Sequence, residues 1–193
     1  INSYIMATFK INGKNFATQD GTGAATIHSD VVFPAGHVIQ RKKLWSTSTN
    51  SSHISTTSTS YTNTGIYGDF TPIKSSSESQ IKLEMSIGRF EHYGIAAYAT
   101  VTMTTVANDT TTHSNSNDIF DASTTHRWFG YDSSNTGHYA NFEAYIASWS
   151  DGVNTWSAGT SYRFRIYLKT SSGTTIFVHN YSQAQFHALE IMI

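Results

Sequence analysis

Apolar and polar residues alternate along much of this chain. In the clearest segment, Ile81, Leu83, Met85 and Ile87 alternate with Gln80, Lys82, Glu84 and Ser86. The same period of two places Ile95, Ala97, Ala99, Val101 and Met103 opposite Thr100, Thr102 and Thr104, and Tyr162, Phe164, Ile166 and Leu168 opposite Arg163, Arg165 and Lys169. Successive side chains of a β-strand point to opposite faces of a sheet, so each segment is predicted to be a strand with one buried face.

The last quarter of the chain contains two further strand signals. Ser171, Ser172 and Gly173 separate the strand that ends near Leu168 from an apolar run at residues 175–178, a spacing that predicts a β-hairpin. The final strand, residues 188–193, is strongly apolar, and an exposed apolar edge would invite aggregation. We therefore expect this strand to be paired inside a sheet, with Leu189 and Ile191 in the core.

Weaker patterns complete a prediction of the fold class. Further strands are predicted at residues 37–45, 61–70, 126–130 and 141–149. Residues 46–60 are mostly Ser and Thr, a composition that suits either a glycosylated linker or, as we favour, strand and loop with a solvated face. No segment of ten or more residues has a helical apolar period, so the chain is predicted to be all-β, an antiparallel β-sandwich of jelly-roll type.

The N-terminal residues form a separate unit in this pattern. Residues 6–19 predict a small hairpin that turns at Asn12-Gly13, and the Gly-rich stretch at residues 20–23 predicts a flexible link. The domain boundaries expected from this are an arm and linker at residues 1–32 and a sandwich domain at 33–193. An isolated hairpin is marginal in water, so its apolar residues Phe9, Ile11 and Phe16 are candidate residues for attachment to a partner surface.

Composition excludes several classes of function. Charged residues are only 13% of the chain and the formal net charge is -1, so the main driving force for nucleic-acid binding is lacking. The absence of cysteine excludes disulfides and thiolate metal sites. No apolar run approaches the roughly 20 residues that span a bilayer, so membrane insertion is not expected either.

Candidate chemistry is sparse. The nine histidines have none of the paired spacings that aim two imidazoles at one metal ion. Asp118 and Asp121 lie in a loop-like stretch that could serve a calcium ion or a glycosidase pair, but loop carboxylates more often cap their own backbone. No nucleophile, phosphate-binding or dinucleotide motif occurs, so we expect neither an enzyme nor a bound cofactor or metal.

Aromatic residues concentrate in the most loop-rich third of the chain. An indole or phenol ring packs well against the apolar face of a sugar, which makes exposed aromatics candidates for binding a glycan or receptor. Trp149 continues an alternating strand and is expected in the core, whereas Tyr131 and Trp156 are flanked by loop residues and are expected to be exposed. The candidate contact residues are Trp128, Tyr131, Tyr139 and Trp156.

Several short motifs make residues 33–193 resemble a known family. They are Pro34-Ala35-Gly36-His37-Val38-Ile39-Gln40, Thr59-Ser60-Tyr61-Thr62-Asn63-Thr64-Gly65, Phe70-Thr71-Pro72, Ser75-Ser76-Ser77, Ile81-Lys82-Leu83 and Ala188-Leu189-Glu190-Ile191. In this order they resemble a C-terminal β-domain found in structural and tail-fibre proteins of marine bacteriophages. The stretch Phe177-Val178-His179-Asn180-Tyr181 departs from that family's pattern.

The resemblance implies a non-enzymatic, homotrimeric part of a virion surface, whose partners are other copies of the chain and phage capsid or tail proteins. The chain has no heptads or fibrous repeat for a fibre shaft, so a complete chain suits a head-decoration protein or a short fibre or adaptor. A fragment of a longer fibre would instead suit a tip that binds a host-surface receptor or glycan, with contacts expected in residues 108–137. The remaining alternative is a carbohydrate-binding module or polysaccharide depolymerase, since sandwiches host both.

Overall fold

The chain folds into two compact units, Ile1–Ala35 and Gly36–Ile193. The computed structural model describes residues 7–11, 13–19, 26–27, 34–46, 53–93, 96–119, 129–131, 136–146, 155–178 and 183–193. The first unit is a small antiparallel sheet in which β1 (Ala7–Ile11), β2 (Lys14–Gln19) and β3 (Thr26–Ile27) follow one another. The predicted hairpin is confirmed. The third strand has only two residues, too few to show a period in the sequence.

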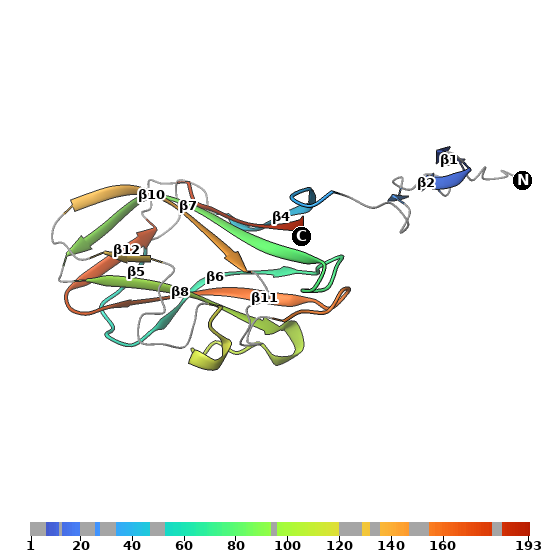
Figure 1. Ribbon diagram of the computed structural model, residues 1–193. Coiled ribbons are helices and arrows are strands. Elements are labelled where there is room, and N and C mark those ends of the chain that lie inside the picture. Colours follow the sequence, from blue (N-terminus) through green and yellow to red (C-terminus); the bar gives the residue numbers. More distant parts are fainter. Residues whose placement is uncertain are drawn as a thin grey trace, which may run out of the picture. The chain divides into compact units, whose positions relative to one another are not determined.

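The second unit is a sandwich of two antiparallel sheets, which face each other as two layers in Figure 1. The six-stranded sheet contains, in order, β4 (Val38–Ser46), β13 (Gln185–Met192), β7 (Ser79–Tyr93), β12 (Thr174–Val178) and β5 (Ile54–Thr56), with β10 (Thr136–Ile146) also paired to β7. The four-stranded sheet contains β6 (Thr62–Phe70), β11 (Tyr162–Thr170), β8 (Ala97–Thr105) and β9 (Phe129–Tyr131). The prediction of an all-β antiparallel sandwich is confirmed.

Helix is nearly absent from the described residues, which contain only two short 3-10 turns, η1 (Val106–Asn108) and η2 (Asn115–Asn117). The strands predicted at 37–45 and 61–70 are β4 and β6. Those predicted at 126–130 and 141–149 appear as β9 and β10, although residues 126–128 and 147–149 lie outside the described part. Within the Ser/Thr-rich run, residues 54–56 form β5 and residues 47–52 are not among those described.

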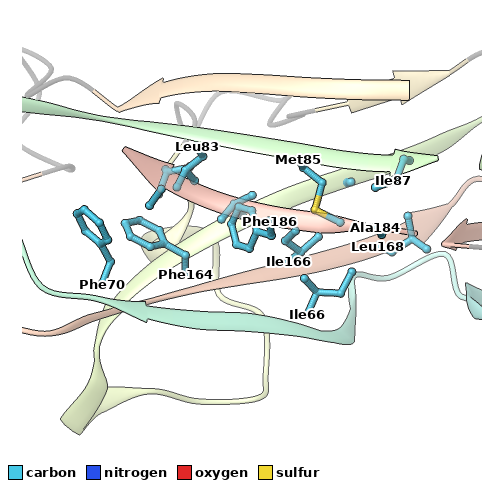
Figure 2. Close-up of a cluster of buried hydrophobic side chains, with 14 of the residues drawn as sticks. Ile66, Phe70, Leu83, Met85, Ile87, Phe164, Ile166, Leu168, Ala184 and Phe186 are labelled. Carbon is cyan, nitrogen blue, oxygen red and sulfur yellow. The ribbon is translucent and has the colours of Figure 1, made fainter. Parts of the chain in front are cut away.

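The core lies between the two sheets. Figure 2 shows side chains of β7 from one layer meeting those of β6 and β11 from the other. The fully buried members include Ile66, Phe70, Ile81, Leu83, Ile87, Phe164, Ile166 and Phe186. The apolar sides predicted for residues 81–87 and 162–168 are confirmed as core, as are Ala97, Ala99 and Val101, while Ile95 lies outside the described residues.

The prediction of a hairpin after Leu168 is wrong. β11 lies in the four-stranded sheet and β12 lies in the six-stranded sheet, so residues 171–173 carry the chain from one layer to the other. β11 pairs with β6 on one edge and with β8 on the other, so it has no edge left for β12. Strand alternation shows which face of a strand is buried, but it does not show which strand is its neighbour.

The last strand, β13, is an inner strand between β4 and β7, as predicted. Its core residues are different from those expected, because Phe186 and Ala188 point into the sandwich while Leu189 is only half-buried. The alternation that begins at Phe186 therefore brings Glu190, not Leu189, to the core side of the strand. Ile191 is buried next to a shift in register against β4.

The two sheets approach closely where β4 passes β6. A side-chain carbon built on Gly68 would lie 2.5 Å from the carbonyl oxygen of Leu44 and 2.6 Å from its Cβ. Only a residue without a side chain fits at this point, which explains a glycine inside a strand. The close approach brings the half-buried Leu44 and Trp45 against the core.

Two substitutions in β13 test which side of the strand faces the core. We expect Phe186→Ala to lower the free energy of unfolding by about 3–5 kcal/mol, the range for deleting a buried aromatic ring. Leu189→Ala should cost about 1 kcal/mol, because its side chain is already partly in water. Urea unfolding of the two variants measures both values, and equal losses would contradict the assigned faces.

Candidate functional site

The N-terminal hairpin exposes an apolar face. Phe9, Ile11 and Phe16 are 60%, 51% and 36% exposed, respectively. The rings of Phe9 and Phe16 pack edge to face with their centroids 5.7 Å apart. The three residues predicted as attachment residues are therefore all accessible, and two of them form one aromatic cluster. A sheet this small cannot bury its own apolar side chains, so they remain available to a partner.

The aromatic residues predicted to contact a glycan are placed differently. Trp156 was expected to be exposed, but this is wrong, since it is only 3% exposed and its indole Nε1 donates to the Lys74 carbonyl at 3.2 Å. Its own carbonyl accepts from the amide of Ser76, so it anchors a loop. Tyr131 belongs to β9 and Tyr139 to β10, strands of different sheets, while Trp128 lies outside the described residues.

A buried carboxylate ties together one end of the sandwich. Glu190 is fully buried, and its Oε1 accepts from the Lys74 amide at 2.7 Å and from the Ser79 hydroxyl at 2.9 Å. Its Oε2 accepts from the Ile73 amide at 2.8 Å and from Gln40 Nε2 at 2.9 Å. Both oxygens are occupied by two donors each, so this carboxylate is engaged in structure and not free to act as a general base.

The same network joins motifs that are far apart in the sequence. Gln40 belongs to the opening motif of the resemblance, Glu190 to its last motif, and the amides that Glu190 binds directly follow the Thr71-Pro72 turn. Gln40 Nε2 also donates to the carbonyl of Thr71 at 2.9 Å. These motifs therefore meet at one buried hydrogen-bond network, which gives them a structural role.

The outer face of the four-stranded sheet carries a compact ionic cluster. Arg163 binds Asp69 with two hydrogen bonds, at 2.6 Å from Nε and 2.9 Å from Nη2, and reaches Asp109 from Nη1 at 3.0 Å. Arg165 donates from Nη2 to the same Asp109 oxygen at 2.6 Å. Arg165 is only 3% exposed, so the pairing compensates a charge that has lost most of its water.

The arginines shift the acidity of both carboxyl groups. Hydrogen bonding from Arg163 is the main reason that the pKa of Asp69 lies below its ordinary value. Burial acts to raise the pKa of Asp109, but hydrogen bonds from Arg165 and Arg163 outweigh it and the pKa is lowered. Both guanidinium groups also lie against the ring of Tyr67, at 4.8 and 4.5 Å from its centroid. Each arginine of the cluster is thus paired with a carboxylate and also lies against an aromatic ring.

The segment after β8 covers the next part of this sheet face. Asp118 forms an isolated antiparallel β-bridge with Thr102 and is buried, and both its carboxylate oxygens lie within 3.2 Å of His113 Nε2. The His113 ring packs against those of Tyr61 and Tyr167, with centroids 4.6 and 5.1 Å away. The Asp118 carboxylate, for which loop-capping, calcium-binding and catalytic roles were considered above, holds His113, while Asp121 lies outside the described residues.

Tyr167, on β11, helps to hold the segment after β8 against the sheet. Its hydroxyl donates to the carbonyl of Thr110 at 3.1 Å, and burial is the main reason that its pKa is raised. Thr100 and Thr102, on the outer side of β8, are consequently buried although they face away from the core. Their side of the strand was identified from the sequence, but the loop that covers them was not.

Among the residues that the structure describes, no group of three or more His, Asp or Glu side chains is placed to hold a metal ion. Within the same residues, no helix has the length and apolar character needed to cross a membrane. Comparison with known proteins finds no matching family model, no matching curated protein and no matching solved structure.

Replacing Glu190 by Gln tests the buried network. The amide group would direct an NH2 toward two of the four donors, leaving buried polar groups without partners. We expect a loss of about 3 kcal/mol in the free energy of unfolding. Glu84→Gln, on the outer face of β7, is the matched control and should cost less than about 1 kcal/mol. Equal losses in chemical denaturation would rule out a special role for Glu190.

The ionic cluster predicts a specific acid sensitivity. Asp69 and Asp109 have lowered pKa values in the folded chain, so their contribution to stability is complete above the ordinary Asp value of 3.8 and is lost as the pH falls through their folded pKa values. We expect the melting temperature to drop more steeply below about pH 4 in the native chain than in an Asp69→Asn, Asp109→Asn double variant. Parallel pH dependences would contradict this.

Proposed function

We propose that this chain is a non-enzymatic structural protein of a bacteriophage surface, a head-decoration protein or a short fibre or adaptor, docked through its N-terminal arm. The observation that carries the proposal is the exposed cluster of Phe9, Ile11 and Phe16 on a unit separate from the sandwich. Full burial of one such side chain contributes about 1.5–3 kcal/mol, so three of them can hold the protein on a partner. The partner in this proposal is a capsid or tail protein.

Backbone groups of the arm offer a second source of affinity. Among the described residues β1 pairs with β2 alone, so within this part of the chain no strand occupies its other edge, where an added strand would pair. Strand addition satisfies main-chain donors and acceptors while alternate side chains enter pockets of the partner. An apolar hairpin that gains both interactions on docking fits an attachment device.

The sandwich supports the same proposal as a self-contained body. Its buried charged groups are engaged: Glu190 accepts from four uncharged donors, Asp118 contacts His113, and Arg165 binds Asp109. These pairings hold loops in place and suit a durable particle component. The motif resemblance described above points to the same class of protein.

Contact between copies of the chain is part of this proposal. Val38, Ile73 and Ile193 are exposed apolar residues close to the Glu190 network, since Val38 pairs with Ile191, the Ile73 amide binds Glu190 and the Ile193 amide binds the Glu78 carbonyl. With so few charged residues on the chain, such side chains favour association between subunits. We propose a homotrimer on this basis and on the family resemblance.

A triple substitution in the full chain tests the arm. We expect Phe9→Ser, Ile11→Ser, Phe16→Ser to abolish co-sedimentation with phage particles that lack the native protein, because the apolar contact area is gone. The melting of the sandwich should not change. The control variant Lys10→Ser, Lys14→Ser alters exposed residues of the same hairpin and should bind as the native chain does.

The proposal fails if the triple variant binds particles normally, since the arm would then be no anchor. Loss of the cooperative melt in the triple variant would instead show that the hairpin contributes to the folded core. Electron microscopy of decorated particles separates capsid lattice points from tail ends, and so distinguishes the decoration protein from the short fibre.

A further inference from the structure

The segment after β8, residues 106–118, forms a flap over the outer face of the four-stranded sheet. Figure 1 shows it in yellow-green, on the side of β8 and β11 that faces away from the other layer. At one end, the Val106 amide donates to the Ser161 carbonyl at 3.0 Å. At the other end, the Ile119 amide donates to the Val101 carbonyl at 3.0 Å, and Ile119 is buried in the core. Both ends of the flap are therefore fixed to the sheet as long as the sandwich is folded.

Between its ends, the flap is held by polar contacts. Every residue from Asn108 to Asp118 is polar. Within residues 106–118, all of which the structure describes, Asp118 alone is buried, and neither η1 nor η2 contains a buried residue. Burial of apolar surface is the main stabilising contribution in a protein core. A segment with few buried apolar contacts opens locally at a lower cost in free energy than the core does.

The contacts of the flap with β11 centre on Asp109. Arg165 donates to the Asp109 carboxylate from Nη2 at 2.6 Å and from Nε at 3.4 Å, and Arg163 donates from Nη1 at 3.0 Å. Arg163 also holds Asp69 of β6 with two hydrogen bonds. The further contact of Arg165 is with the neutral side chain of Asn63, at 3.3 Å. Since Arg165 is 3% exposed, the carboxylate that compensates its buried charge is supplied by the flap.

The closed flap also has a cost in hydrogen bonding. Thr100 stands opposite Tyr167 in the register of β8 and β11, and Thr104 stands opposite Arg163. Among the described residues, the buried hydroxyls of Thr100 and Thr104 find no hydrogen-bond partner. A buried hydroxyl without a partner is unfavourable, and opening of the flap would let water reach it. This cost and the entropy lost by the ordered loop both oppose the closed form.

We propose that residues 106–118 open from the sheet as a unit while the sandwich stays folded, and that the ion pair between Asp109 and Arg165 is the latch. The open form uncovers Arg165 and Tyr167, whose side chains the closed flap engages through Asp109 and Thr110. The outer face of the four-stranded sheet therefore has two forms, one presented by the polar flap and one by the strands beneath it. The latch is the contact that sets the balance between them.

Native-state hydrogen exchange on the full chain tests the proposal. The Asn117 and Asp118 amides donate to carbonyls within the flap, so their exchange reports its opening. In the native chain, low concentrations of urea should hardly change their exchange rates, because local opening exposes little surface, whereas amides of β11 should accelerate. An Asp109→Asn variant should exchange the flap amides about tenfold faster, because the buried charge of Arg165 loses its partner.

The matched control is Asp69→Asn, which removes a carboxylate from the same ionic cluster but not from the flap. It should change exchange of the flap amides by less than about twofold, because the Asp69 contact is the same in the closed and open forms. An Arg165→Gln variant should also accelerate the flap amides. Combined with Asp109→Asn, its effect should be smaller than the product of the two single effects, since both variants remove one contact.

The proposal is overturned if Asp109→Asn and Asp69→Asn accelerate the flap amides equally, because the flap would then exchange only when the whole sandwich unfolds. Flap amides that accelerate with urea as steeply as those of β11 would overturn it too, and this measurement needs no variant. Independent effects of the substitutions at Asp109 and Arg165 would show that their ion pair is not the latch. None of these outcomes involves the arm, so the proposed docking is tested separately.

Discussion

The buried carboxylate of Glu190 is the constraint on which one end of this sandwich depends. A buried charge is tolerated only when its hydrogen-bonding capacity is met, and here four uncharged donors meet it. Those donors come from β4, from the loop after β6 and from the start of β7, so β13 cannot enter its place unless all three are positioned. The chain achieves this without a cysteine, and the same end of the sandwich is where Gly36 joins the terminal strand through a backbone bond to Met192.

The four-stranded sheet also pairs its poorly hydrated charged groups with partners, on its outer face. Arg163, Arg165 and Tyr167 point outward from β11. Ion pairs with Asp109 and a hydrogen bond to Thr110 hold the segment after β8 over them. A chain with few charges has thus placed several of them in internal contacts. The exposed apolar side chains of the arm remain for binding. A stable sandwich and an exposed apolar arm are what the proposed function requires.

The sequence allowed the fold class to be predicted, because burial on one side of a strand leaves a period of two, as in residues 81–87. Strand neighbours were not predictable in the same way, since the link at Ser171 to Gly173 has turn composition whether it closes a hairpin or crosses between sheets. Leu189 was predicted as core from its apolar side chain, and this is wrong because the alternation along β13 starts from the buried Phe186. The burial of Trp156 and the pairing of Asp109 with Arg165 depend on contacts between residues far apart in the chain. Local sequence carries no signal for such contacts.

The central claim is that a rigid sandwich is held on a particle by its arm, and hydrogen exchange measured on the free and the particle-bound protein tests it most directly. In the free protein, the amides of Ile73 and Lys74 should be strongly protected by Glu190, while those of β1 exchange rapidly. Binding to the particle should protect the β1 amides and leave Ile73 and Lys74 unchanged. Rapid exchange at Ile73 and Lys74 in the free protein, or β1 amides that gain no protection on the particle, would contradict this account.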